Sequence, residues 1–487
     1  MLEVLLSLLL AVSSLPSINV SATRTASPVQ KSKAAEAQAA PAPAADSYDK
    51  YLTALTDLGR FSGAVQVARN GKVEFRKAYG FADVEKHAPF TVETQIEIAS
   101  ISKMFTARAV LKLRDAGKLK LDASVCEYLK DCPDAWKPIT IDELVHHTSG
   151  IPDYEDALEL GSPRYLAIMT APDSSSRILA NAKTKPLDFN PGSKFKYSNT
   201  GYVVLGFVVE QVSGEPFGKF IVDEILKPAG MTHSGVFGYG DAPTNLAHGY
   251  TRGDMDWGEM LRGVRLESEH LTAVPPLLLT PPHGDAGMFS TVDDLYAWAV
   301  AMDGGPEVSP ALATEIFSPG RDGYGFGWTI GEDYGAKRYQ HIGLLPGYDS
   351  ALIKFPAEKI TIVVVSNLDR IRLGTVTAVL SAIALGKPWD MPVTGRVQTL
   401  TPAQQDALYG NYALEGGSVV IIARDADSVS AQVKDKFLAV LVPMGATRFY
   451  MPMSEGTVTF LLDSDGHATA INLHYRGEDH KGSLVAP

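Results

Sequence analysis

The sequence of 487 residues is poor in cysteine, since only Cys126 and Cys132 occur. Two thiols with no histidine pattern nearby make a poor zinc site. Positive charge is also scarce, because 44 Lys and Arg residues stand against 56 Asp and Glu residues and give a formal net charge of -12. Phosphate binding needs a basic face, so this balance argues against nucleic acid as a partner.

Long apolar runs are missing after the first residues, so we expect no integral membrane segment once the N-terminus is removed. Residues 1–15 contain an apolar run of about a dozen residues, which suits a signal-peptide core but is too short to cross a bilayer. Val20–Ala22 offers small residues for cleavage, although the preceding region carries Glu3 and no Lys or Arg. The sequence predicts a signal peptide over 1–22 and a periplasmic or secreted protein.

Export would allow Cys126 and Cys132, six positions apart, to form a disulfide that closes a short loop. The alternative interpretation is two independent, small core residues. Export and the shared short segment favour the disulfide.

Several catalytic patterns are absent as well. No G-x-S-x-G elbow occurs, which argues against an α/β-hydrolase. No H-E-x-x-H pattern surrounds His146 and His147, so we expect them to be structural. The glycine-rich segment 323–327 fits neither a dinucleotide fingerprint nor a P-loop and is interpreted as the entry to a strand. We expect neither metal nor cofactor. No spacing indicates a paired-carboxylate site, so a solvated surface is expected for Asp142, Glu143, Asp153 and Glu155.

The first folded elements follow a long unfolded stretch. Residues 23–46 are rich in Ala and Pro, cannot bury a core and are predicted to be a disordered linker. A domain over 47–387 then opens with strands at 63–68 and 72–78, and Asn70-Gly71 between them is typical of a type I′ hairpin turn.

The later elements indicate an α+β fold. Helical spacing covers 100–116, and Thr291 with Asp294 resembles a capping box at the start of another helix. The remaining predicted segments are a mostly helical region over 140–300, strands at 351–355 and 360–365, and a helix near 371–385. Strands at both ends suit one antiparallel sheet in which the first and last strands meet.

The pattern of the C-terminal part predicts a separate small β domain. Residues 388–400 contain Pro388 and Pro392 and are predicted to be a linker. Over 401–487, short β-rich runs recur at roughly ten-residue spacing, which favours an antiparallel sheet or barrel.

Ser100-Ile-Ser-Lys103 is the first pattern with catalytic potential. Residues three apart share a helix face, so the Lys103 amine can reach the Ser100 hydroxyl. A serine hydroxyl needs an adjacent base, and a buried lysine with a lowered pKa can serve as one. The pattern is weak alone, because Ser47–Lys50 matches it too, inside the predicted tether. The alternative for Ser100 is an ordinary helix cap.

Two further patterns follow in order. Tyr197-Ser-Asn199 offers a phenol that can relay a proton and an amide that can hold a substrate side chain; Tyr409–Asn411 repeats it. His341-Ile-Gly343 is predicted on a strand, where Gly343 would allow a substrate to approach and His341 could bond the phenol or a substrate carboxylate. His480–Gly482 repeats this pattern in the C-terminal module.

Residues 50–385 resemble the serine β-lactamase-like family, which includes class C β-lactamases, DD-peptidases, D-aminopeptidases and related esterases. The resemblance rests on the three patterns and on further segments, namely Phe61–Ala64, Ile139–Leu144, His147–Ile151, Leu226–Met231 and Gly287–Thr291. It implies a β-lactamase/transpeptidase-like antiparallel sheet flanked by helices, an all-helical subdomain and a small appended β domain.

The resemblance also implies a role for each motif residue. Ser100 matches the acylated serine, Lys103 its activator and Tyr197 the proton shuttle. The implied substrate contacts are Asn199, His341 and Gly343, with an oxyanion hole formed by the backbone N–H groups of Ser100 and Leu344.

The implied activity is a serine acyl hydrolase acting on a small molecule or short peptide with an amide, ester or lactam carbonyl. His341 stands where class C β-lactamases have lysine, and a neutral imidazole holds a carboxylate less firmly than an ammonium does. This argues against efficient β-lactam hydrolysis. Within the family an H-x-G strand is more similar to those of DD-peptidases, D-aminopeptidases and uncharacterised hydrolases, so the resemblance implies a DD-peptidase, D-aminopeptidase or esterase. The alternatives are a non-hydrolytic penicillin- or cell-wall-peptide-binding protein and a true class C-like β-lactamase. The sequence leaves the oligomeric state open.

Overall fold

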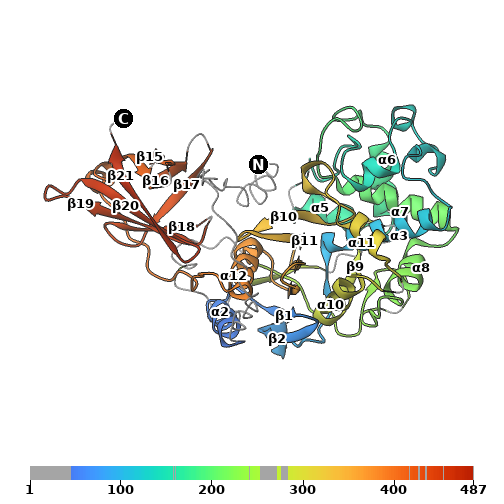
Figure 1. Cartoon of the computed structure of the whole chain (residues 1–487), viewed down its shortest axis with the longest axis horizontal. Coiled ribbons are helices and arrows are strands. Elements are labelled where there is room, and N and C mark those ends of the chain that lie inside the picture. Colours follow the sequence, from blue (N-terminus) through green and yellow to red (C-terminus); the bar gives the residue numbers. More distant parts are fainter. Residues whose placement is uncertain are drawn as a thin grey trace, which may run out of the picture.

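The computed structural model describes the chain from residue 45 to residue 485, apart from short gaps (Figure 1). The gaps are residues 157, 159–160, 241, 253–260, 262–270, 276–282, 306, 416, 426–427, 434–435 and 453. The predicted signal peptide and almost all of the predicted linker therefore lie outside the described residues. Across the part of the chain that is described, no helix combines the length and the apolar character needed to cross a bilayer.

A six-stranded antiparallel sheet with the order β10-β11-β12-β13-β1-β2 forms the centre of the larger part of the chain. Strand β1 (Gly63–Arg69) pairs with β13 (Ile360–Ser366) along its full length, which confirms that the first and last strands meet. Asn70 and Gly71 both have positive φ, as the predicted hairpin turn requires. The other strands are β2 (Lys72–Tyr79), β10 (Thr329–Asp333), β11 (Ala336–Leu345) and β12 (Tyr348–Phe355).

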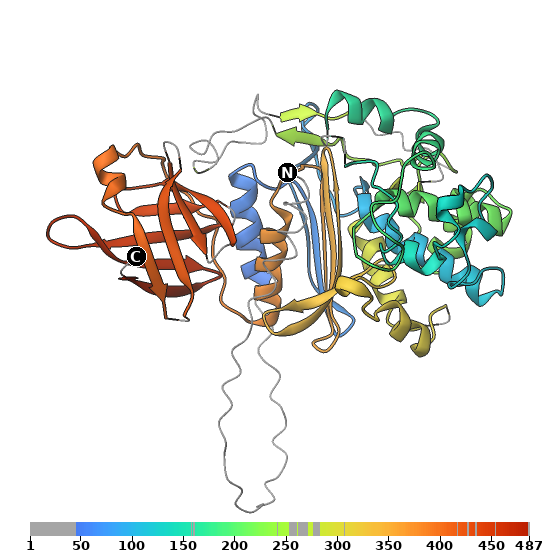
Figure 2. The same cartoon turned by 90° about the horizontal axis from the view of Figure 1, so that it is seen from above.

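Helices cover both faces of this sheet, so β12 and β13 are buried throughout. Helices α2 (Ala45–Asp57) and α12 (Leu373–Leu385) pack on one face, and the helical region covers the other (Figure 2). The linker prediction was wrong at Ala45 and Asp46, and the placement of the Ser47–Lys50 pattern in a tether was wrong as well. Helix α2 begins at Ala45 and buries Tyr48 completely, so Ser47 and Lys50 lie on a folded helix and not in a tether. The cause is the apolar spacing of the tyrosines and leucines between 48 and 55, which supplies one buried helix face.

The helical region lies between β2 and β10 in the sequence. Thr291 accepts the N–H of Asp294 at 3.2 Å at the start of one helix, but the Asp294 carboxylate accepts from the His233 N–H at 2.7 Å. Only half of the predicted capping box therefore forms. The helices are α3 (Ser102–Asp115), α4 (Ile141–Val145), α5 (Pro163–Met169), α6 (Ser174–Ala182), α7 (Asn199–Ser213), α8 (Phe217–Ile221), α10 (Val292–Ala301) and α11 (Pro310–Ile316).

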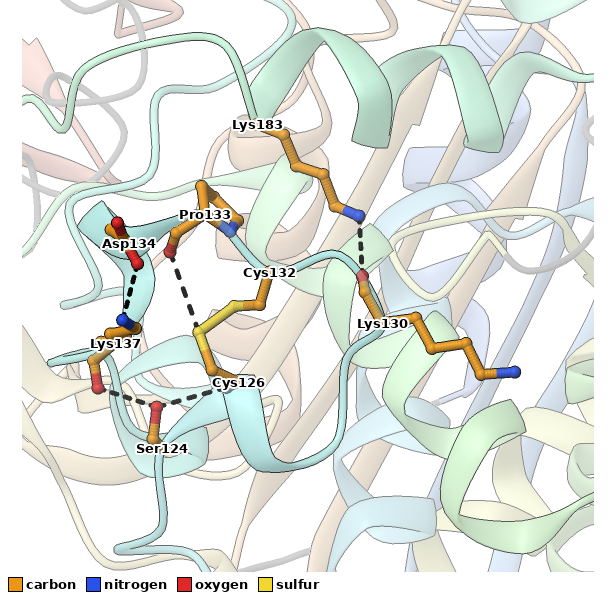
Figure 3. The surroundings of a disulfide bond; sticks show 8 residues. All are labelled: Ser124, Cys126, Lys130, Cys132, Pro133, Asp134, Lys137 and Lys183. Atoms are coloured by element: carbon orange, nitrogen blue, oxygen red, sulfur yellow. Dashed lines mark hydrogen bonds and ion pairs between the residues drawn. A yellow bond between two sulfur atoms is a disulfide. The ribbon is translucent and has the colours of Figure 1, made fainter.

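Cys126 and Cys132 form a disulfide, with their Cα atoms 5.3 Å apart (Figure 3). This confirms the predicted bridge over the alternative of two independent core residues. The Ser124 hydroxyl accepts the Cys126 N–H at 3.2 Å and donates to the Lys137 carbonyl at 2.7 Å. Hydrogen bonds therefore hold the loop on both sides of the bridge.

The C-terminal part is a closed eight-stranded antiparallel barrel in which β21 returns to pair with β14. This confirms the predicted small β domain. The repeated motif residues Asn411, His480 and Gly482 lie on its strands. The strands are β14 (Gly410–Leu414), β15 (Val419–Asp425), β16 (Ser428–Val433), β17 (Lys436–Pro443), β18 (Arg448–Met451), β19 (Gly456–Leu462), β20 (Ala468–Tyr475) and β21 (Glu478–Val485).

Polar contacts attach the barrel to the side of the sheet that carries α2 and α12 (Figure 2). Arg372, which precedes α12, donates to the Tyr450 hydroxyl at 2.6 Å and to Glu455 at 2.5 Å. Arg476 donates to Asp333 of β10 at 3.2 Å. The barrel thus packs beside α2 and α12, across the sheet from the helical region.

Candidate active site

Ser100 lies in the short 3-10 helix η1 (Ala99–Ile101), which leads directly into α3. The sequence predicted Ser100 as the first residue of the α-helix, but α3 begins two residues later. Ala99 has a φ of 50°, which is a strained value for a residue other than glycine. This turn leaves Ser100 partly exposed and Lys103 fully buried. The two side chains still meet, because they remain three residues apart on a helical backbone.

Lys103 is at the centre of the site. Its Nζ donates to the Ser100 Oγ at 3.0 Å, to the Asn199 Oδ1 at 2.7 Å and to the Asp285 carbonyl at 2.9 Å. Burial lowers the pKa of Lys103 to about 8, even though Asp285 and two other carboxyl groups favour its charged form. About a tenth of Lys103 is therefore an unprotonated amine at pH 7, a share that grows as the pH rises, and this amine lies within reach of the Ser100 proton.

Tyr197 completes the contact with Ser100. Its ring lies under Lys103, with Nζ 5.0 Å from the ring centroid. Burial raises the pKa of Tyr197 well above its ordinary value, and the hydrogen bond with Ser100 offsets only part of that rise. The phenol therefore keeps its proton, which it can donate to a leaving group.

The His147 ring packs against the Tyr197 ring. The two rings lie with their centroids 4.3 Å apart, and the His147 Nδ1 accepts the Ser198 N–H at 3.0 Å. The ring proton must then be on Nε2. Burial, followed by the charge of Lys103, lowers the pKa of His147 well below its usual value. His147 therefore contacts the Tyr197–Ser198 segment as a neutral, buried imidazole, and its structural role stays a prediction.

Strand β11 forms the opposite wall and passes directly against the Ser100 turn. A Cβ atom at Gly343 would lie 2.3 Å from the Ile98 carbonyl oxygen, 2.5 Å from the Ser350 hydroxyl and 3.0 Å from the Ala99 Cβ. The sequence predicted that Gly343 makes room for substrate. The structure shows that it makes room for the residues preceding Ser100. Leu344 follows it and is exposed, so the oxyanion pair of Ser100 and Leu344 stays a prediction.

His341 is engaged within the protein. Its Nδ1 lies 2.7 Å from the Ile342 carbonyl oxygen, which can only accept, so Nε2 is left to accept from the Tyr324 hydroxyl at 3.0 Å. Burial, with the nearby Lys103 charge, lowers the pKa of His341 to about 3. The phenol that bonds His341 is therefore Tyr324 and not Tyr197, and the sequence gave no sign of this pairing.

Two acids predicted on a solvated surface lie in the site instead. Asp153 is buried and accepts the backbone N–H groups of Asn199 and Glu155, the latter at 2.8 Å. Glu155 is only partly exposed and accepts from the Asn199 Nδ2 at 3.1 Å. The prediction was wrong because the contacts of these acids with Asn199 join residues more than 40 positions apart, and no local spacing reveals such contacts.

Asp285 is the third acid, and the sequence reasoning missed it. Its carboxylate contacts His283 Nδ1 at 3.0 Å and accepts from the Tyr154 hydroxyl at 2.9 Å. Burial raises its pKa, but the hydrogen bond from His283 and the charge of Lys103 outweigh burial, so the pKa is lowered overall. The Asp285 carboxylate is therefore ionised, and its negative charge favours the charged form of Lys103.

Only one group among the described residues has the spacing of metal ligands, and it lies apart from this site. Asp83, Glu85 and His248 place their donor atoms within 4.8 Å of one another. The Asp83 carboxylate already forms a 2.7 Å ion pair with Lys86.

Replacing Gly343 with alanine should lower the rate of Ser100 acylation by about 100-fold or more, because the added methyl group must push the Ile98–Ala99 backbone away from β11. Stopped-flow acylation by a fluorescent penicillin measures the effect. The matched control is Gly482→Ala, in the repeated pattern of the barrel, where the new Cβ mainly meets movable side chains. Equal acylation rates in wild type and Gly343→Ala would show that the close packing of Gly343 against Ile98 and Ala99 does not help to position Ser100.

The comparisons with known proteins agree with this geometry. The Beta-lactamase family model matches residues 48–384. Penicillin-binding protein 4* of Bacillus subtilis is 26% identical over 429 residues, covering 83% of this chain and 91% of the relative. A penicillin-binding protein structure from Bacillus halodurans superposes with a TM-score of 0.58 at 27% identity, over 68% of this chain and 99% of that one. D-amino acid amidase from Ochrobactrum anthropi shares the fold, with a TM-score of 0.57 at 20% identity over 69% of this chain and 99% of that one. The chain belongs to the Beta-lactamase family.

Proposed function

We propose that this protein is a serine acyl hydrolase that works through a covalent acyl-enzyme on Ser100. The observation that carries the proposal is the 3.0 Å contact between the Lys103 Nζ and the Ser100 Oγ, made by a buried lysine whose pKa is lowered to about 8. A serine needs such a base to become a nucleophile. The family relationship supports the same chemistry.

Acylation transfers the Ser100 proton to the neutral amine of Lys103 while Oγ bonds to the substrate carbonyl carbon. The backbone N–H groups of Ser100 and Leu344 stabilise the oxyanion. When the intermediate collapses, the bond to the leaving group breaks. Tyr197 donates its phenol proton to the leaving group, and Lys103 passes the proton taken from Ser100 on to Tyr197. Water then attacks the ester in the same way and releases Ser100 and a carboxylic acid.

The substrate is a small molecule or short peptide with an amide or ester bond, as in a DD-peptidase, D-aminopeptidase or esterase, in preference to a class C-like β-lactamase. His341 argues against a class C-like β-lactamase and, among these candidates, favours esters and amides without a free carboxylate, because its pKa of about 3 leaves it neutral and both ring nitrogens are already bonded. It cannot supply a positive charge for a substrate carboxylate. The Cys126–Cys132 disulfide supports an exported enzyme.

A turnover panel tests the proposal. Purified protein would be assayed with a p-nitrophenyl ester, a D-amino acid amide, a D-Ala-D-Ala peptide and a chromogenic cephalosporin. We expect turnover of the ester or an amide and slow or no turnover of the cephalosporin. A stable Ser100 acyl-enzyme without turnover of any substrate would favour the alternative, a non-hydrolytic penicillin- or cell-wall-peptide-binding protein.

A further inference from the structure

Both ends of the Asn199 side-chain amide form hydrogen bonds, one through the oxygen and one through the nitrogen. Its Oδ1 accepts from the Lys103 Nζ at 2.7 Å, and its Nδ2 donates to the Glu155 Oε2 at 3.1 Å. An amide can rotate by a half-turn and exchange these two atoms. The Lys103 ammonium can only donate and an ionised Glu155 can only accept, so together they select the orientation that directs the Asn199 oxygen toward Lys103.

The backbone around this amide is fixed by the same segment. Asn199 is the first residue of α7, and its N–H donates to Asp153, two residues before Glu155. Asp153 also accepts the Glu155 N–H at 2.8 Å, so one carboxylate binds both the backbone of Glu155 and the first residue of α7. The segment 153–155 therefore sets both the position and the rotation of Asn199.

The charges of Glu155 and Lys103 depend on each other. Burial, followed by Asp153 and Asp285, raises the pKa of Glu155 to about 8, and Lys103 draws it down. In return Glu155 favours the charged form of Lys103, whose pKa is also about 8. Among the described residues, the titratable groups that interact with Glu155 are Lys103 of α3, Tyr165 of α5, Tyr197, Asp285, and Asp153 and Tyr154 of its own segment.

From this geometry we infer that Glu155 is a positioning residue for acylation. It holds the Asn199 amide so that Lys103 points at Ser100, and its negative charge, which forms over the same pH range in which Lys103 loses its proton, raises the pH at which Lys103 becomes a base. The inference rests on the proposed function, because it assigns Glu155 a role in that reaction. Glu155 does not contact Ser100, so it acts through Asn199 and Lys103.

Two substitutions separate the two effects. Glu155→Gln keeps the size of the side chain and an oxygen that can accept from Asn199, but it removes the charge. Glu155→Ala removes both. Asp156→Asn is the matched control, because Asp156 is an exposed carboxylate next in the sequence that pairs with Lys196.

The readout is the second-order rate constant for acylation of Ser100 by a fluorescent penicillin, measured between about pH 6 and about pH 10. We expect the wild-type rate to rise through about pH 8. In Glu155→Gln the midpoint should fall by about one pH unit, because Lys103 loses a group that stabilises its charged form. Glu155→Ala should show the same shift and a plateau lowered by about tenfold or more. Asp156→Asn should leave the profile unchanged.

An unmoved midpoint in Glu155→Gln would overturn the inference, even if its thermal stability or plateau rate fell, because a purely structural role lowers these without shifting the titration. The failure of the proposed function looks different. In that case wild type itself would show no label on Ser100 with either the penicillin or a fluorophosphonate, and the inference would fall with it.

Discussion

Replacing Ser100 with alanine should reduce turnover of every substrate to the background rate, a loss of at least about 10⁴-fold. The reason is that alanine has no oxygen to form the acyl-enzyme, while the environment of Lys103 stays intact. The measurement is the initial rate with the best substrate of the panel, together with a thermal melt that shows an unchanged fold.

Ser47→Ala is the control for this substitution. Ser47 and Lys50 form the same four-residue pattern on α2, a helix that packs on the opposite face of the sheet from the helical region. Its activity should match wild type. Residual turnover in Ser100→Ala within about tenfold of wild type would remove Ser100 as the nucleophile.

Replacing Lys103 with methionine should lower the acylation rate by about 10³-fold, because the Tyr197 phenol, which also bonds Ser100, keeps its proton and cannot take the place of the amine. The rise of the rate with pH should change with it. In wild type the rate increases as Lys103 loses its proton through about pH 8, and in the variant this limb should disappear. Acylation kinetics across this pH range test both expectations.

Lys354→Met is the matched control, since Lys354 is also a buried lysine whose pKa burial lowers, but it lies on β12 and bonds Ala299 and Asp303. Both variants remove a buried ammonium, and their effects on stability should be comparable. A loss of rate in Lys354→Met as large as in Lys103→Met would indicate that the loss reflects stability alone. An unchanged pH limb in Lys103→Met would show that another group is the base.

Patterns of neighbouring residues in the sequence predicted much of the fold and part of the candidate site. The hairpin of β1 and β2 follows from alternating residues around Asn70-Gly71, because the turn type is set by those two residues. The contact of Ser100 with Lys103 follows from three-residue spacing on a helical backbone. The small β domain follows from recurring short apolar runs, although closure of β14 on β21 into a barrel needed the structure.

Contacts between distant segments could not be predicted. Glu155 looked like a surface acid because its neighbours in the sequence are polar, and only the approach of α7 places Asn199 against it. A second reason for glycine at position 343 was missed for the same reason, since the backbone that packs against it belongs to Ile98 and Ala99. Tyr324 lies in a glycine-rich segment with no motif, and its bond to His341 forms only when the sheet is assembled.

The location of the covalent adduct tests the central claim most directly. Wild-type protein would be reacted with a fluorophosphonate or a penicillin, digested and mapped by mass spectrometry, with Ser100→Ala treated in parallel. We predict a single adduct on the peptide that contains Ser100, and none in Ser100→Ala. An adduct on any other serine, retained in Ser100→Ala, would contradict the assignment of Ser100 as the nucleophile.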